Sequence, residues 1–266
     1  MSSVQPEIEV ARPDDAAAIV DIIRLGFRPN LLDKFIYGCA GVENYVRELI
    51  RTHPIADTTF LVARAEGEVA GCIEMRSLAD RLFLNYVAVR PEIRAAKIGS
   101  RLLAAAITRC RREEQHAMSL DVLEDNAVAS AWYAKLGFAR DHETVWWTLP
   151  LQSDGIEYEA QVAGIPQQVT NHAAFGFSSL DVPIAGAAHR VGLLGDRWFR
   201  LTTPESVSEG RLHSVLRRID ATREVLALLP LNEMPEALSG LATRVTATHR
   251  MTADLDSLIH HLEVNS

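Results

Sequence analysis

The first part of the chain alternates between short apolar runs and amphipathic stretches. After the pair Asp14-Asp15, apolar residues recur at helical spacing, which predicts a capped helix. Residues 82–89 are apolar on both faces, as expected of a central strand that is covered on both sides. In chain order the expected elements are a strand at 8–11, a helix through 18–25, a helical region at 31–53, strands at 59–64, 69–76 and 82–89, a helix through 98–107, a strand at 118–123, a helix at 127–136 and a closing strand at 144–149.

The second part has a weaker pattern and begins after a polar turn at 152–155. The expected strands are 157–162, 174–182, 190–202 and 225–229, the expected helices are 207–219 and 234–245, and a strand with a short helix fills 248–262. A shift of 106 positions places Leu120 on Leu226 and Asn126 on Asn232 without a gap. We expect two α/β domains with mixed sheets, 1–151 and 156–266, the second a degenerate copy of the first. The alternative is chance agreement between two α/β segments of the same periodicity.

Composition narrows the class of protein. The chain has 27 Lys and Arg against 35 Asp and Glu, a net charge of −8, which argues against a nucleic-acid partner. Cys39, Cys72 and Cys110 are far apart and odd in number, so we expect free thiols in a reducing cytoplasm. The histidines show no metal-ligand spacing, and we expect no metal. The start has no signal-peptide pattern, and no apolar run approaches the ~20 residues of a membrane span. We therefore expect a cytoplasmic protein that binds no membrane.

One strand, loop and helix carry the chemistry. The apolar run 82–89 leads through a short loop into the helix at 98, so free backbone N–H groups and a helix dipole meet at one point. Arg94 and Lys97 add positive charge, and Gly99 with Ser100 leaves room for a phosphate oxygen. This pattern indicates a pyrophosphate site that is neither a P-loop nor a dinucleotide fingerprint. A capped helix with a solvated basic start is the alternative.

This stretch resembles motif A of the GCN5-related N-acetyltransferases, the GNAT superfamily. The matching positions are Val89, Pro91, Arg94, Gly99 and Leu102-Leu103. A second family element follows at the usual distance, with Asn126, Tyr133 and Leu136-Gly137-Phe138. The resemblance covers about residues 7–150 and implies the GNAT fold, with a degenerate GNAT-like second domain.

The resemblance also implies roles for individual residues. Acetyl-CoA would lie between the strands 82–89 and 118–123, and Tyr133 would give a proton to the leaving thiolate. Asn126 would bind near the pantetheine or cap the helix that follows it. The region 27–53 would shape the acceptor pocket. The backbone of Val87, Ala88 and Val89 would bind the pantetheine, and the pyrophosphate would contact Arg94, Ala95, Ala96, Lys97, Ile98, Gly99 and Ser100.

Two positions leave alternatives open. Lys97 stands where the family has its first motif glycine, so it would crowd the loop if that position needs a positive φ. Glu74 is the acidic residue inside a predicted central strand, where burial would suit it as a general base. The other interpretations are a strand-end Glu74 that faces solvent, or a Glu74 that is paired with Arg76. No cysteine lies in either motif, which favours direct transfer over an acyl-enzyme.

The second half lacks the candidate binding and catalytic residues of the first. Its counterpart of motif A, residues 204–210, has no arginine and carries extra acid, and Ser239 stands in place of Tyr133. We expect an acetyl-CoA-dependent N-acetyltransferase that acts on a primary amine of a small molecule, and we leave a homodimer open. The alternatives are a protein or peptide N-acetyltransferase, and a CoA-binding regulatory module without turnover.

Overall fold

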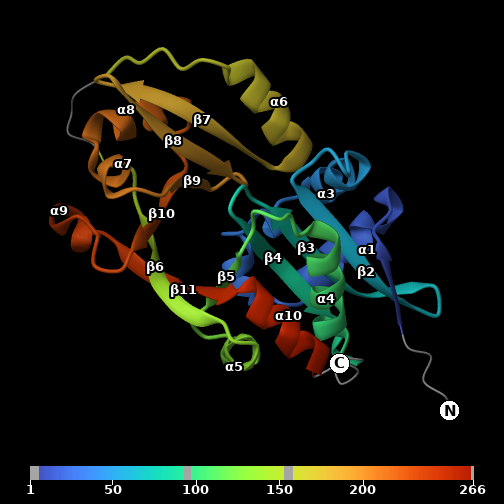
Figure 1. Cartoon of the computed structure of the whole chain (residues 1–266). Coiled ribbons are helices and arrows are strands. Elements are labelled where there is room, and N and C mark those ends of the chain that lie inside the picture. Colours follow the sequence, from blue (N-terminus) through green and yellow to red (C-terminus); the bar gives the residue numbers. More distant parts are fainter. Residues whose placement is uncertain (1–5, 93–96, 153–157, 265–266) are drawn as a thin grey trace. The chain divides into compact units, whose positions relative to one another are not determined.

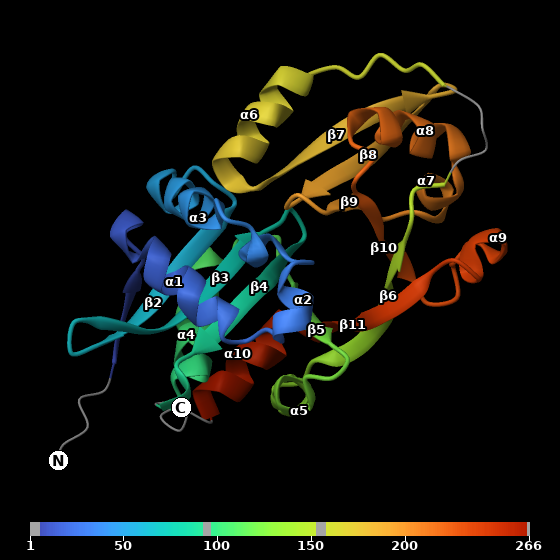
Figure 2. The same ribbon diagram turned by 180° about the vertical axis from the view of Figure 1, so that it is seen from behind.

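The computed structural model describes residues 6–92, 97–152 and 158–264 and divides into two compact units. Unit 1 comprises residues 1–28, 43–141 and 249–266, and unit 2 comprises residues 29–42 and 142–248. Figures 1 and 2 show the elements of both units from the front and from behind. Of the predicted site residues, Arg94, Ala95 and Ala96 lie outside the described residues.

Unit 1 is built on a mixed sheet with helices on both faces. Its strands are ordered β1-β2-β3-β4-β5-β11, and antiparallel pairing changes to parallel between β4 and β5. Helix α4 lies on one face of β3 and β4 with α10 packed beside it, and α1 lies on the other face (Figures 1 and 2). The bounds of the strands are β1 Glu7–Val10, β2 Thr58–Ala65, β3 Glu68–Ser77, β4 Arg81–Val89, β5 Ala117–Leu123 and β11 Thr243–Asp254. The bounds of the helices are η1 Pro13–Asp15, α1 Ala16–Arg24, α3 Val42–Arg51, α4 Ile98–Cys110, α5 Ala127–Lys135 and α10 Leu255–Val264.

The core of unit 1 explains its strand pattern. Seven consecutive residues of β3, Val69 to Met75, are buried, because helices cover both faces of that strand. The core on the α4 side of β4 and β5 contains Leu102 and Leu103 of α4 and Leu258 of α10, all fully buried. The expected strand at 82–89 and the helix after 97 are confirmed.

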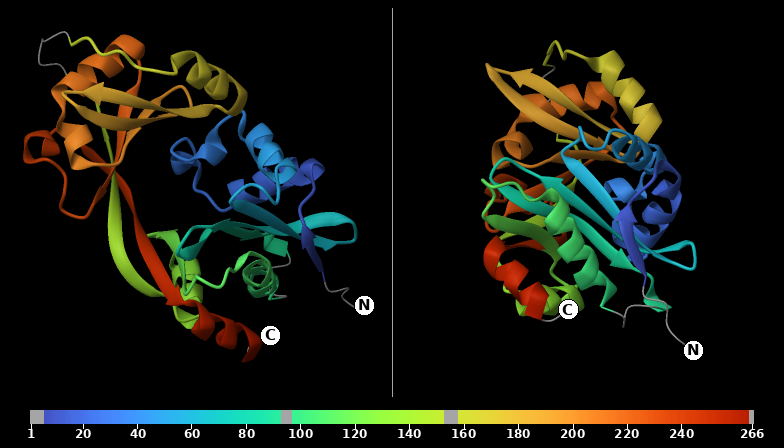
Figure 3. Two further views of the ribbon diagram at one scale, coloured as in Figure 1. Left: turned by 45° about the horizontal axis from the view of Figure 1, so that its top comes forward. Right: turned by 45° about the vertical axis from the view of Figure 1, so that its right-hand side comes forward.

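Unit 2 repeats the same plan. Its strands are ordered β7-β8-β9-β10-β6-β11, with β9 parallel to β10. The core lies between these strands and the helices α7 and α8, while α6 runs beside β7 (Figure 3). The remaining bounds are α2 Pro29–Leu32, η2 Ile36–Gly38, β6 Ala139–Leu149, α6 Ile165–Phe175, β7 Phe177–Ile184, β8 Ala187–Leu194, β9 Trp198–Leu201, α7 Pro204–Ser208, α8 Gly210–Ile219, β10 Glu224–Pro230 and α9 Glu236–Ser239.

The closing strands of the two halves are exchanged. The strand expected to close the first domain is β6, and it pairs with β10 of unit 2, Leu149 opposite Val225 and Val145 opposite Leu229. In return, β11 follows β5 in unit 1, and α10 fills the core beside α4. The compact units therefore differ from the expected linear division between 151 and 156. Apolar alternation marks a strand but not its partner, because many strands share the same two-residue period.

The sequence pattern also misplaced elements in the second half. Residues 158–162 form no strand, and the helix α6 was not expected. No residue of α6 is buried, so its sequence has no strong apolar face to reveal it. The expected strand 190–202 is two strands, β8 and β9, separated by a turn in which Gly195 has a positive φ.

Candidate functional site

The parallel pairing of β4 with β5 covers only the first part of β4. Their parallel pairing extends from Arg81 opposite Ala117 to Leu84 opposite Leu120, and no later pair is recorded among the described residues. Arg90 donates its N–H to Ala70 of β3, so the alternation of the backbone directs the N–H and C=O of Val87 away from β3. The two predicted neighbours Ala88 and Val89 are half-buried. An extended ligand could hydrogen-bond to this edge as an added strand would.

A β-bulge interrupts the pairing of β3 with β4 just after Leu84, the residue at which the pairing of β4 with β5 ends. Glu74 lies opposite Tyr86 and Met75 lies opposite Leu84, so Asn85 is the extra residue. The side chain of Glu74 points into the protein, with the residue only 3% exposed, and its Oε1 accepts a hydrogen bond of 2.7 Å from Asn85 Nδ2. Arg76 forms an ion pair of 3.2 Å with Asp57. The solvent-facing alternative for Glu74 is wrong, and its role as a base stays a prediction.

Tyr133 lies on α5 with its ring in the core of unit 1. The ring packs against Trp132 and Phe138, with centroids 4.9 and 5.7 Å away. Burial raises the pKa of the Tyr133 phenol above its usual value, so the hydroxyl stays protonated at neutral pH. A buried, protonated phenol can give a proton to a thiolate but is a poor base.

The start of α4 has a left-handed residue where the family has a glycine. Lys97 precedes the helix with φ 53° and ψ 20°, and its carbonyl accepts the N–H of Arg101. The conformation costs a side chain such as lysine about 1–2 kcal/mol. Of the predicted pyrophosphate residues beyond it, Ile98 is buried in the core of unit 1. Gly99 lies beside the Trp132 ring, and a Cβ there would meet ring carbons at 3.7 Å, an ordinary contact.

Asn126 caps α5. Its Oδ1 accepts a hydrogen bond of 3.1 Å from the N–H of Ala129, so the capping alternative is confirmed. Ser130 lies on α5 three residues before Tyr133 and on the same face of the helix. Its hydroxyl is buried with no partner among the described residues. Nothing in the sequence pattern distinguished this serine.

The cysteine nearest the site is unsuited to nucleophilic chemistry. Cys72 is fully buried on β3, opposite Ala88, and burial raises the pKa of its thiol far above the usual value. The thiolate form required for attack is therefore absent at neutral pH.

Tyr45 and Tyr86 lie near Glu74, and neither was singled out from the sequence. Tyr45 of α3 is mostly buried, and burial followed by the charge of Glu74 raises the pKa of its phenol. Phe27 meets Tyr86 edge to face at 5.9 Å, and the next residue, Arg28, forms an ion pair with Asp125 after β5. Their relation to Glu74 depends on packing between distant segments, which sequence spacing does not reveal.

The region expected to shape the acceptor pocket is divided between the units. Phe27 and Tyr45 belong to unit 1, whereas residues 29–42 belong to unit 2. In unit 2, Asp33 accepts a hydrogen bond of 3.1 Å from Trp198 Nε1, and Lys34 Nζ lies 4.9 Å from the centre of that ring. These contacts fix the short helix α2 to β9.

The counterpart site of unit 2 satisfies its own polar groups. At the start of α7, Thr203 Oγ1 accepts the N–H of Ser206, and His189 Nδ1 lies 2.9 Å from Ser206 Oγ. Ser239, the counterpart of Tyr133, donates its hydroxyl to the carbonyl of Glu236. These contacts occupy groups that a phosphate or a leaving thiolate would need.

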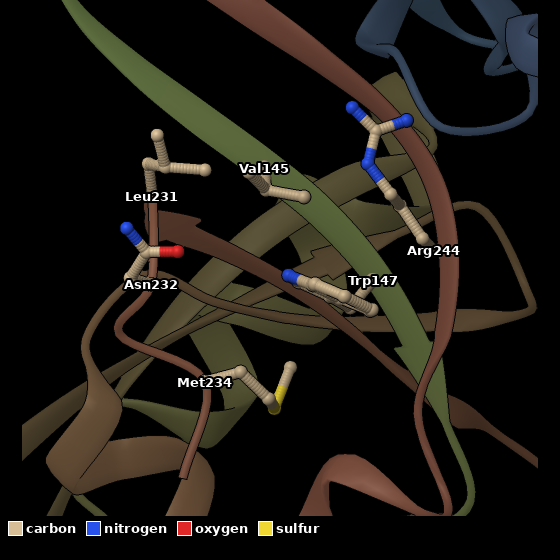
Figure 4. A pocket seen from close by; sticks show the side chains of 6 residues that line it. All are labelled: Val145, Trp147, Leu231, Asn232, Met234 and Arg244. Atoms are coloured by element: carbon tan, nitrogen blue, oxygen red, sulfur yellow. The ribbon is translucent and has the colours of Figure 1, made fainter.

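Unit 2 also carries an open pocket of about 410 Å³ on the face of β6 (Figure 4). It is lined by Val145, Trp147, Leu231, Asn232, Met234 and Arg244. Of the adjacent tryptophans, Trp146 is buried and Trp147 is half-buried at this pocket. Neighbouring residues on a strand face opposite ways, which accounts for this division.

Within residues 6–92, 97–152 and 158–264, no group of three or more His, Cys, Asp or Glu could hold a metal ion. No helix in the same ranges is long and apolar enough to cross a bilayer.

Comparison with curated proteins points to one family. The model of the Acetyltransferase (GNAT) family matches residues 32–138. Spermidine N(1)-acetyltransferase of Thermoplasma acidophilum is 30% identical over 96 residues, 36% of this chain and 60% of that protein. A Bacillus subtilis protein assigned as a ribosomal protein bS18-alanine N-acetyltransferase is 27% identical over 95 residues, 36% of this chain and 61% of that protein. The chain thus spans about 60% of the length of these curated relatives.

Solved structures extend the similarity in fold to nearly the whole chain. A Pyrococcus horikoshii protein assigned as an acetyltransferase has a TM-score of 0.63 at 17% identity, covering 96% of this chain and 91% of that one. A tandem GNAT protein from the clavulanic acid biosynthesis pathway has a TM-score of 0.61 at 15% identity, covering 94% and 98%. Residues 32–138 are thus similar to the acetyltransferase (GNAT) family, and the fold of nearly the whole chain is similar to that of a tandem GNAT protein.

Proposed function

We propose that this chain is an acetyl-CoA-dependent N-acetyltransferase that acetylates a primary amine of a small molecule in a ternary complex. The observation that carries the proposal is the end of the pairing between β4 and β5 at Leu84 and Leu120, within the region that matches the family. The edge of β4 around Val87 would bind the pantetheine arm, and the backbone from Lys97 to Ser100 would bind the pyrophosphate.

The chain's own residues can supply each proton movement of the reaction. Glu74 would take a proton from the amine, whose nitrogen then bonds to the acetyl carbon. The N–H of Val87 would stabilise the oxyanion. As the carbon–sulfur bond breaks, the protonated Tyr133 would give its proton to the sulfur. Cys72 takes no part, since its thiol is buried and protonated.

The acceptor is inferred from burial and charge. Glu74 is 3% exposed, so a slender amine reaches it more readily than a folded protein would. The net charge of −8 favours a cationic acceptor. The two curated relatives are named for spermidine and for a ribosomal-protein alanine, so the acceptor class needs a direct test.

The test is thiol release from acetyl-CoA with a panel of acceptors. The panel contains spermidine, short primary amines and amino acids, and a peptide with an N-terminal alanine. The proposal predicts release above the hydrolytic background with one or more small amines and none with the peptide. Release with the peptide alone would assign the chain to peptide acetylation, and binding without release to any acceptor would favour a regulatory module.

A further inference from the structure

The bulge in β4 gives Asn85 a position that regular pairing would not. In an uninterrupted antiparallel ladder, neighbouring residues on a strand point to opposite faces. Because Asn85 is the extra residue between Leu84 and Tyr86, the ladder bends there and the amide turns to Glu74. The distance from Asn85 Nδ2 to Glu74 Oε1 is 2.7 Å, the length of a charge-assisted hydrogen bond.

The hydrogen bond from Asn85 matters for the charge of Glu74 because of the groups that face this carboxylate. Tyr45 on α3 and Cys72 on β3 both stay protonated, because burial and then the charge of Glu74 raise the pKa of each. On β4 the facing residue is Tyr86. Arg76, two residues further along β3, forms an ion pair of 3.2 Å with Asp57. A buried carboxylate in such surroundings ionises at neutral pH only if donors hold its charged form.

We propose that Asn85 is a positioning residue, which holds the Glu74 carboxylate ionised and fixes the orientation in which it receives the proton of the acceptor amine. This inference rests on the proposed function, in which Glu74 is the base. The proton leaves the amine nitrogen and binds a carboxylate oxygen, while Asn85 keeps its own protons and contacts neither substrate. The bulge thereby places an amide donor against a buried base.

The first test is the pH dependence of kcat/KM in three variants. Asn85→Ala removes the donor, and Asn85→Asp keeps the shape of the side chain but adds a like charge. We expect the acidic limb of the pH profile of kcat/KM to move up by about one pH unit in Asn85→Ala, because a hydrogen bond to a charged group is lost. In Asn85→Asp the limb should move up further, because a like charge is added. The control is Arg81→Ala on the same strand, whose side chain pairs with Asp80 and which should leave the limb in place.

The second test needs no turnover. Carbon-13 labelling of glutamate carboxyls follows the titration of Glu74 by NMR, with its signal assigned as the one lost in Glu74→Gln. We expect the Glu74 signal to titrate about one unit higher in Asn85→Ala than in the wild type, and at the wild-type pH in Arg81→Ala. If Asn85→Ala does not fold, Asn85→Asp provides the comparison.

The inference is overturned if Glu74 titrates at the same pH in the wild type and in a folded Asn85 variant. An absence of acetyl transfer by the wild type would instead contradict the proposed function. The NMR titration would then decide by itself whether Asn85 holds Glu74 ionised.

Discussion

Arg250 of β11 forms a two-bond ion pair with Asp121 of β5, although 129 positions separate the two residues. Two residues along each strand, in opposite chain directions, Thr252 Oγ1 lies 2.9 Å from Ser119 Oγ. These contacts hold the last strand of the chain beside the strand that carries one side of the candidate site. The C-terminal segment is therefore part of the unit that would perform the chemistry.

That exchange predicts that α10 stabilises unit 1. Leu258→Ala removes a fully buried side chain from the core shared with α4 and should lower the free energy of unfolding by about 2–5 kcal/mol. Chemical denaturation measures the loss. His260→Ala, two residues on and exposed, is the control and should change it by less than about 0.5 kcal/mol. Equal stability of Leu258→Ala and the wild type would contradict the assignment of α10 to this core.

Tyr133→Phe tests the proton donor. The substitution keeps the buried ring and removes the hydroxyl, so kcat should fall by about 10²-fold or more, the usual scale of acid catalysis. The affinity for acetyl-CoA, measured by calorimetry, should stay within about twofold, since the ring packing is retained. Tyr158→Phe in unit 2 is the matched control and should retain full activity. A Tyr133→Phe enzyme with wild-type kcat would exclude this hydroxyl as the donor.

Much of unit 1 can be predicted from sequence because its signals are local. The apolar run of β4, the helix after Lys97 and the cap at Asn126 follow from short-range spacing. The exchanged strands β6 and β11, the unburied helix α6 and the bulge at Asn85 could not be predicted in this way. Each depends on which distant segment supplies the partner, and that information is not carried by residue periodicity.

Lys97 offers a test of the backbone at the start of α4. A β-branched residue tolerates a positive φ less well than lysine, so Lys97→Val should lower stability by about 1 kcal/mol. Lys97→Gly removes the side-chain strain but adds freedom to the unfolded chain, so its stability should lie within about 1 kcal/mol of the wild type. Thermal melting compares the three proteins. If Lys97→Val melts with or above Lys97→Gly, the left-handed conformation is not the native one.

His213 predicts a pH dependence of stability in unit 2. Its Nδ1 accepts the N–H of Gln152 and its Nε2 contacts the carbonyl of Val207, which requires the neutral ring. Burial lowers the pKa of His213 below its usual 6.5, so the unfolded chain binds the proton more readily. The stability from the neutral ring is complete above pH 6.5 and is lost as the pH falls below that value.

Urea denaturation at pH 7.5 and pH 5.5 checks this prediction for the wild type and His213→Asn. The wild type should lose more free energy of unfolding between the two values than the variant does, because the variant has no ring to protonate. The exposed His260→Ala should lose as much as the wild type. An identical loss in wild type and His213→Asn would refute the role of this histidine.

The most direct test of the central claim is calorimetric titration of the intact chain with acetyl-CoA, paired with thermal melting. Saturable binding near one site per chain is expected, since the counterpart groups of unit 2 are occupied by internal contacts. At a ligand concentration of about 100 times Kd, binding should stabilise the fold by about 2.7 kcal/mol and raise Tm by several degrees. No binding and no shift at millimolar acetyl-CoA would mean that the edge of β4 beyond Leu84 does not hold this substrate, and the transferase account would be abandoned.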